Sequence, residues 1–304
     1  MKNEKNSPAQ KTVREKTAEE RFQPAIGREE IARAADILQR YRAGKAALDR
    51  RIVDNELWFK MAHWKQYKNR LMDEKAQPAS GWLFNSIANK HGDAMDNYPE
   101  PSVLPRAADD TETARQLSAI LPALLDKCQY EQVYSDTWWY KLKQGTGVKG
   151  VFWDQSQGDG RGDIVIRRMD LLMLFWEPGV MDIQDSPHFF SLALVDNERL
   201  AAQWPQMAGR TGRTVDVATY VHDDAVDTSG KSIVVDWYYK RRRGGRTVVH
   251  YCKFCNGEVL YASENDPRLY ETGFYEHGKY PFVFDTLFVE EDTPAGFGYI
   301  DVMK

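Results

Sequence analysis

The stretch QGTGVKG, residues 144–150, marks the point at which the sequence changes from a helical to a strand-like pattern. Before it, apolar residues recur every three or four positions, which is the period of an amphipathic helix. After it, short runs of β-branched and aromatic residues alternate with glycine-containing turns, as in antiparallel strands. We therefore predict an α+β fold, with long helices over residues 28–145 followed by a mainly antiparallel, β-rich region over residues 146–304.

Residues 1–27 precede these two regions and are rich in Lys, Glu, Gln and Thr. Such a composition cannot bury enough apolar surface to fold, so we expect a disordered or loosely held arm. The arm has no apolar run of the kind found in secretory signals, and nothing in the chain is apolar over the length of a membrane span. Three cysteines do not make a disulfide framework. A protein kept in the cytosol, or in a particle assembled there, is expected.

The pattern from residue 28 to residue 72 predicts a long helical segment. Its first apolar face is marked by Ile31, Ala34, Leu38 and Tyr41, and a second face by Leu57, Met61 and Trp64. Gly44 lies between the two faces, and because glycine weakens a helix interior, we expect it to divide the segment into two helices.

A break at residues 77–81 predicts a shorter helix after it, with Ser80 as its possible N-cap. Residues 98–105 contain three prolines and must be extended. A second long helical region then opens at Asp109 and Asp110, and Pro122 within it predicts a kink or a restart. The apolar stripe of this region consists of Leu117, Ile120, Leu121, Leu124 and Leu125.

Short apolar runs in the second half of the chain predict the strands. These runs cover residues 148–153, 164–168, 189–195, 233–239, 248–252, 259–261 and 282–289. Asn197 is expected to cap a short helix that ends before Pro205.

The balance of charge argues against a protein that grips DNA. Lys and Arg number 41 against 45 Asp and Glu, for a net charge of -4, whereas tight DNA binding rests on basic side chains that neutralise phosphates. A conduit through which DNA slides gains nothing from tight binding, so the charge balance does not exclude a ring that conducts DNA. The nine Trp, fifteen Tyr and thirteen Phe fit either large contacts between subunits or a large aromatic core.

The glycines of residues 145–150 also match the pattern GxGxxG of dinucleotide-binding loops. Such a loop needs a strand before the glycines and a helix after them, so that the helix N-terminus faces the pyrophosphate. Here the predicted order is the reverse, and we interpret the pattern as a helix C-cap and a turn. The sequence has no P-loop motif either. No nucleotide cofactor is predicted.

Cys252 and Cys255 have the spacing of one zinc knuckle. A structural zinc needs four ligands, and the other candidates, Cys128, His250 and His277, show no second paired spacing. His250 and Cys252 share a face of a predicted strand, whereas Cys255 is expected in the turn beyond it. A hairpin with two buried or half-buried cysteines is preferred, and no metal is predicted.

The remaining polar clusters are assigned to loops. The basic cluster KRRRGGR, residues 240–246, is interpreted as a solvated hairpin turn, with a phosphate contact as the alternative. The group of Asp223, Asp224 and Asp227 lacks the spacing of a calcium loop. The six histidines form no HExxH motif, and no GxSxG is present. We predict no catalytic residue and no enzyme, and the sequence identifies no DNA-contacting residue.

Several segments, taken in order, carry a further resemblance. A Trp-rich helix at residues 55–67, NELWFKMAHWKQY, is followed by GWLFNSIAN at residues 81–89 and by the extended run 98–105 with Asp109 and Asp110 after it. The later segments are GTGVKGV at residues 145–151, WEPG with DIQD within residues 176–185, KYPFV at residues 279–283 and GFGYID at residues 296–301.

From about residue 40 to residue 304, these segments resemble the N-terminal, wing-containing half of the portal proteins of tailed bacteriophages. The glycine-rich segment is similar to the helix-to-strand step of that family, and the last two to the stretch just before its stem helices. One departure is Glu177, where the family more usually has Asp.

The resemblance implies a wing-like α+β domain from a dodecameric ring, the head-to-tail connector at one capsid vertex. Double-stranded DNA passes non-specifically through such a ring during packaging and ejection. The partners implied are copies of itself, the terminase large subunit, capsid and scaffolding proteins and head-completion or adaptor proteins, with no membrane. The location implied is the virion, with the host cytoplasm during assembly, or a prophage as the source.

Portal proteins continue through stem, clip and crown regions, so the resemblance implies that this chain is truncated before them. Two alternatives stay open. One is a zinc- or nucleotide-dependent enzyme of DNA metabolism that uses Cys252 and Cys255, and the other is a different structural protein of a phage head.

Overall fold

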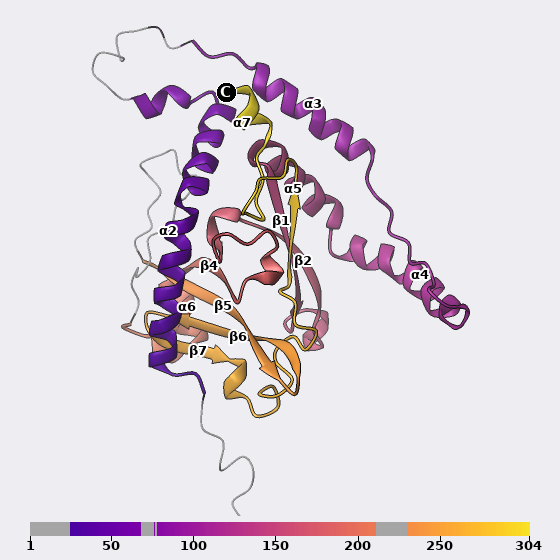
Figure 1. Ribbon diagram of the computed structural model, residues 1–304, viewed down its shortest axis with the longest axis vertical. Helices are drawn as coiled ribbons and strands as arrows, with labels where there is room; N and C mark the ends of the chain where they lie inside the picture. Colours follow the sequence, from indigo (N-terminus) through magenta and orange to yellow (C-terminus); the bar gives the residue numbers. More distant parts are fainter. Residues whose placement is uncertain (1–24, 68–75, 77, 211–229) are drawn as a thin grey trace, which may run out of the picture.

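The computed structural model describes residues 25–67, 76, 78–210 and 230–304. The arm predicted over residues 1–27 therefore lies outside the described residues, apart from 25–27. A long helix runs along one side of the molecule, two sheets lie beside it, and a helical arm projects from the opposite side (Figure 1). Long helices precede strands that pair antiparallel throughout, so the predicted α+β class is confirmed.

Helix α2, Arg28–Phe59, is continuous, so the predicted division at Gly44 is wrong. A Cβ at Gly44 would lie 2.4 Å from Cγ of Pro178. The glycine thus admits the Pro178 loop against the helix, and that contact outweighs its weak helix propensity. The helix ends at Phe59, because Met61 turns the chain with φ 56° and the short 3-10 helix His63–Tyr67 follows; residues 68–72 of the predicted segment lie outside the described residues.

Helix α3, Trp82–Asp96, has Gly81 rather than Ser80 at its N-cap. Helix α4, Thr111–Lys127, follows the 3-10 turn Ala108–Asp110 and runs through Pro122 without a break. The interruption comes instead at Gln129, whose left-handed φ of 52° separates α4 from helix α5, Tyr130–Gln144. The restart expected at Pro122 is therefore seven residues too early in the chain.

The predicted strands are all present, most of them longer than expected, and one was missed. In chain order they are β1 Thr146–Asp154, β2 Asp163–Met169, β3 Leu174–Trp176, β4 His188–Asp196, β5 Lys231–Arg243, β6 Arg246–Cys255, β7 Glu258–Ala262 and β8 Phe282–Thr286. The three-residue β3 is too short to give a pattern in the sequence. The last strand ends at Thr286 rather than at residue 289.

The strands form two sheets with the orders β2-β1-β8 and β3-β4-β5-β6-β7. One face of the five-stranded sheet packs on α2, as the alternate residues Ile233, Val235 and Trp237 of β5 join Leu38 and Tyr41 in one apolar cluster. The other face packs on the three-stranded sheet through a second cluster. That cluster includes Val148, Leu172, Trp176, Phe189, Tyr238 and Phe282.

Two short helices complete the fold. Helix α6, Asn197–Gln203, is capped by Asp196, whose carboxylate accepts the N–H groups of Glu198 and Arg199, so the cap predicted at Asn197 was one residue late. Helix α7, Tyr299–Met303, packs with α3 and α5 through Ile300.

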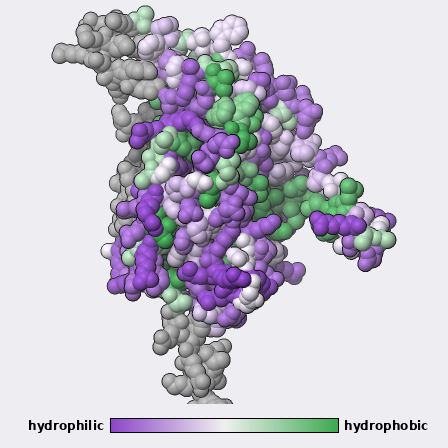
Figure 2. All heavy atoms as spheres, viewed as in Figure 1, coloured by the Kyte–Doolittle hydropathy of each residue, from purple (hydrophilic) through white to green (hydrophobic). Residues whose placement is uncertain are grey.

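Apolar side chains gather on the surface around the base of the projecting α4 arm (Figure 2). Exposed apolar residues near this arm and on the adjoining sheet are Leu104, Leu117, Ile120, Val151, Trp153 and Val283. None of the helices among the described residues combines the length and apolarity that a bilayer span requires.

Candidate functional site

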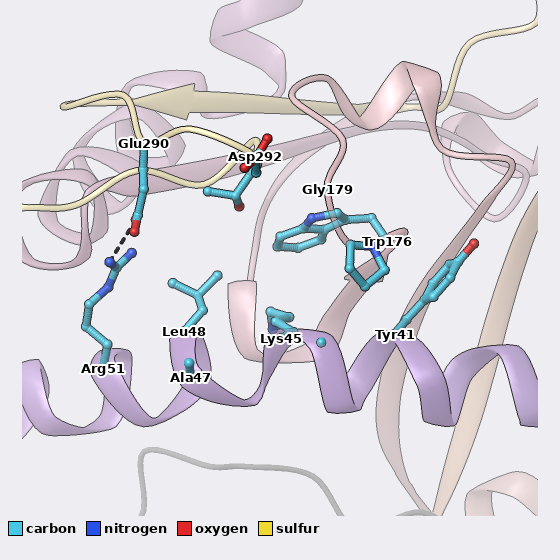
Figure 3. Close-up of a pocket in the computed structure, with 12 residues that line it drawn as sticks. Tyr41, Lys45, Ala47, Leu48, Arg51, Trp176, Gly179, Glu290 and Asp292 are labelled. Carbon is cyan, nitrogen blue, oxygen red and sulfur yellow. Dashed lines mark hydrogen bonds and ion pairs between the residues drawn. The ribbon is translucent and has the colours of Figure 1, made fainter.

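A pocket of about 330 Å³ lies between α2, the loop after β3 and the segment that follows β8 (Figure 3). Trp176 and Tyr41 form part of its wall, and Lys45 lies at its α2 side. The Lys45 ammonium is 2.6 Å from the Asp49 carboxylate and donates to the carbonyl of Leu171, also at 2.6 Å. Burial lowers the pKa of Lys45, and Asp49 opposes that shift. Lys45 is thus engaged within the fold, and we assign the pocket no ligand.

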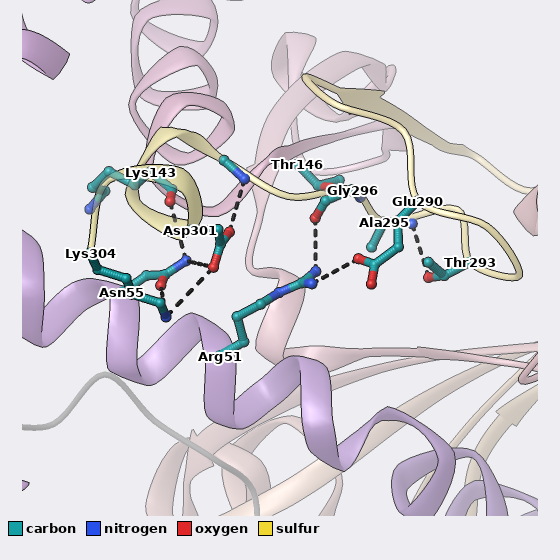
Figure 4. Close-up of polar contacts among 11 residues, drawn as sticks. Arg51, Asn55, Lys143, Thr146, Glu290, Thr293, Ala295, Gly296, Asp301 and Lys304 are labelled. Atoms are coloured by element: carbon teal, nitrogen blue, oxygen red, sulfur yellow. Dashed lines mark hydrogen bonds and ion pairs between the residues drawn. The ribbon is translucent and has the colours of Figure 1, made fainter.

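The segment after β8 is held against α2 by side chains one helical turn apart (Figure 4). Arg51 lies 2.8 Å from the Glu290 carboxylate and donates to the Gly296 carbonyl at 3.0 Å. Asn55 donates to Asp301 at 2.9 Å and accepts a hydrogen bond from Lys304 at 2.7 Å. The direction of α7 is therefore fixed by α2.

Glycines let the same segment lie directly on the start of β1. Gly145 ends α5 in the left-handed region, with φ 84°, and its N–H donates to the Lys141 carbonyl, so the predicted C-cap is confirmed. A Cβ at Gly145 would lie 2.2 Å from the carbonyl carbon of Phe297, and one at Gly298 would lie 2.6 Å from the backbone nitrogen of Gly145. The glycine at the start of the GxGxxG match thus lets two backbone segments approach closely. A strand follows the match, whereas a dinucleotide loop requires a helix there.

A buried ion pair joins α2 to α5. Glu56 and Lys143 are 2.7 Å apart, and each side chain is 8% exposed. Burial opposes the ionisation of Glu56, but Lys143 and then Lys60 hold its pKa below the usual value. The Lys143 ammonium also lies over the ring of Phe59 at 4.8 Å.

The cysteines of the zinc-knuckle spacing lie on opposite faces of the five-stranded sheet. Cys252 belongs to the cluster beneath α2, whereas Cys255 packs with Leu200 and Met207 on the α6 side. Cys255 is the last residue of β6, so its predicted place in the turn was wrong. An irregularity in register between Lys253 and Phe254 precedes it.

Burial raises the pKa of Cys252 to about 12 and that of Cys255 to about 11, which disfavours the thiolate that zinc requires. The Nδ1 atom of His250 is 3.0 Å from the Ser263 hydroxyl oxygen. Over the described ranges, no group of three or more His, Cys, Asp or Glu side chains is arranged to hold a metal ion. The absence of zinc stays a prediction.

The basic cluster of residues 240–246 closes the hairpin between β5 and β6, with Gly244 and Gly245 at the turn, as predicted. Arg243 lies 2.6 Å from the Glu264 carboxylate, and Arg241 lies 3.6 Å from it. Glu264, in the 3-10 turn that follows β7, therefore balances part of the positive charge, and the phosphate contact stays the alternative. Asp223, Asp224 and Asp227 lie outside the described residues.

The apolar stripe of α4 was predicted as a pattern, but its exposure was not. Leu117 is 44% exposed and Ile120 is 56% exposed. Exposed apolar faces of this kind mark sites of contact with other molecules. The periodicity of a sequence identifies an apolar face but does not say whether the same chain covers it, so no sequence signal distinguishes this stripe from a core-facing one.

The fold and these surfaces define the chain as an α+β protein with a projecting helical arm and an exposed apolar face. The family model of the phage P22-like portal protein matches residues 29–282, and the chain belongs to that family. It is a phage portal protein, in a family of structural proteins associated with the capsid vertex and the DNA-packaging machinery. A search of curated proteins gave no match.

Proposed function

We propose that the chain is the subunit of a closed, dodecameric ring at one capsid vertex, through which double-stranded DNA is packaged and later ejected. The family match over residues 29–282 carries this proposal, because it includes the five-stranded sheet, strands β1 and β2 of the other sheet, and helices α3 to α6. The net charge of -4 agrees with DNA that slides through the ring without tight, sequence-specific contact.

The ring would dock the terminase large subunit during packaging and head-completion or adaptor proteins afterwards. It would assemble with capsid and scaffolding proteins in the host cytoplasm, from a phage or a prophage gene, and remain in the virion. The chain itself would catalyse nothing. This is supported by the helix-to-strand order at Gly145, which is the reverse of a nucleotide loop, and by the burial of Cys252 and Cys255 on opposite faces of a sheet.

The test is to place an epitope tag on the chain in the encoding phage and to image antibody-labelled particles by electron microscopy. Label at a single vertex of each particle is expected. Label spread over the shell would identify a different head protein, and unlabelled particles would reject the virion location. Stoichiometric binding of ATP, NAD or zinc by the purified chain would instead favour the alternative of an enzyme of DNA metabolism.

A further inference from the structure

Helix α4 stands away from the body and is fixed mainly at its C-terminal end. Lys127 forms an ion pair with Asp163 at the start of β2, and the Cys128 thiol donates to the carbonyl of Ile164. On one flank of the helix, the Ser118 hydroxyl exchanges hydrogen bonds of 2.8 and 3.2 Å with the backbone of Val103. The extended segment therefore covers that flank.

Part of the exposed surface of α4 is apolar. Leu117 and Ile120 are three residues apart and lie on the same side of the helix, and both are about half exposed. A projecting helix gains nothing for the stability of its own chain from apolar side chains in water. Such a ridge fits a groove on another molecule.

A groove of suitable character lies on the opposite side of the molecule, along α2. It has a volume of about 540 Å³ and more apolar than polar surface, and its apolar lining includes Ala46, Val53, Leu57 and Phe175. Figure 1 shows α2 along one edge of the molecule and the α4 arm extending from the other. Two different surfaces on opposite sides of a chain are what a head-to-tail contact requires.

The charges beside the two surfaces are complementary. The start of α4 carries Asp109, Asp110 and Glu112. The groove on α2 is lined by Arg42 and Arg50 and also by Asp49 and Asp54. The two carboxylates are already paired with Lys45 and Lys304, at 2.6 and 2.7 Å, so the arginines give this edge a positive excess. Opposite charges at the rim of a contact favour the correct register between partners.

We propose that α4 of one copy docks by its Leu117–Ile120 ridge into the α2 groove of the next copy, and that this contact repeats around the assembly. The partner is thus a second copy of this chain. The proposal rests on the proposed ring and names the surfaces that build it. A contact between two α4 ridges would bury the same apolar residues, but it would join only two copies.

The test mixes two single-site cysteine variants and measures cross-linking by a short bismaleimide. One chain carries Ile120→Cys and the other Ala46→Cys, both in a Cys128→Ser background in which the two buried cysteines remain. The matched controls are Ala119→Cys, on the polar side of α4, and Ala47→Cys, which is exposed on α2 but lines the other pocket. Thermal unfolding of each variant verifies the fold.

Because docking raises the local concentration of the two thiols, the Ile120→Cys and Ala46→Cys pair should cross-link at least about tenfold faster than either control pair. With both substitutions in one chain, the product should be a ladder of dimers, trimers and higher species. Equal rates for all pairs, or fastest cross-linking of Ile120→Cys with itself, would overturn the proposal.

This result is separate from the labelling of phage particles. Single-vertex labelling without the specific cross-link would mean that the ring uses other surfaces. A specific ladder without vertex labelling would support the contact between α4 and α2 but reject the proposed portal ring.

Discussion

Replacing Glu56 by leucine should destabilise the protein strongly, because it leaves the Lys143 ammonium buried without its carboxylate. Both side chains are only 8% exposed and lie 2.7 Å apart. Removing one partner of a buried ion pair typically costs about 3–5 kcal/mol, since the remaining charge is neither hydrated nor paired. We expect a loss in this range from the free energy of unfolding.

The reverse substitution, Lys143→Met, should cost less, about 2 kcal/mol, because Glu56 keeps Lys60 at 3.3 Å. The double variant should lie within about 1 kcal/mol of the wild type. Burial lowers the pKa of Lys143 in spite of Glu56, which means that the ammonium is less favourable in place than in water. Two apolar side chains against the rings of Phe59 and Tyr140 remove that penalty.

The assay is urea unfolding of the wild type, the two single variants and the double variant, followed by tryptophan fluorescence. The double-mutant cycle then gives the coupling energy between positions 56 and 143, which we expect to be about 4 kcal/mol or more, because the two single losses together far exceed that of the double variant. A double variant whose loss equals the sum of the single losses would refute the reasoning, because the two charges would then act independently.

Three further predictions concern packing, pH and metal. Gly296→Ala should lower the free energy of unfolding by about 2 kcal/mol or more, since the new Cβ would meet the Phe288 carbonyl. Gly92→Ala, in α3 where no atom lies near the new Cβ, should raise it by up to about 1 kcal/mol. Urea unfolding midpoints measure both changes. Burial, with nearby arginines, lowers the pKa of His188 to about 4, so the stability that the neutral imidazole contributes is present above pH 6.5 and is lost as the pH falls towards 4. This loss should reach at most about 3 kcal/mol and should be smaller in His188→Gln. Unfolding at a series of pH values measures it. Elemental analysis of protein purified without chelator should find no stoichiometric zinc, and a Cys252→Ser, Cys255→Ser variant should still fold; one zinc per chain with loss of folding in that variant would revive the zinc site.

The sequence by itself determined the α+β class, the order of the elements and the meaning of the glycine motif. Each of these depends on neighbours within a few residues. The spacing of Leu117 and Ile120 sets the period of a helix, and alternation along β5 sets that of a strand. A glycine after Gln144 can adopt the left-handed conformation that ends a helix wherever the rest of the chain lies.

Only the tertiary structure decided which surfaces meet. It pairs β1 with β8 from the far end of the chain, places the Phe297 backbone against Gly145 at the helix-to-strand step and brings Arg51 to the segment after β8. It also keeps α2 continuous through Gly44, because Pro178 packs where a side chain would be, and it leaves the α4 ridge uncovered. Local periodicity sets the direction of each side chain relative to its own backbone, whereas burial depends on atoms distant in sequence, whose positions no local pattern contains.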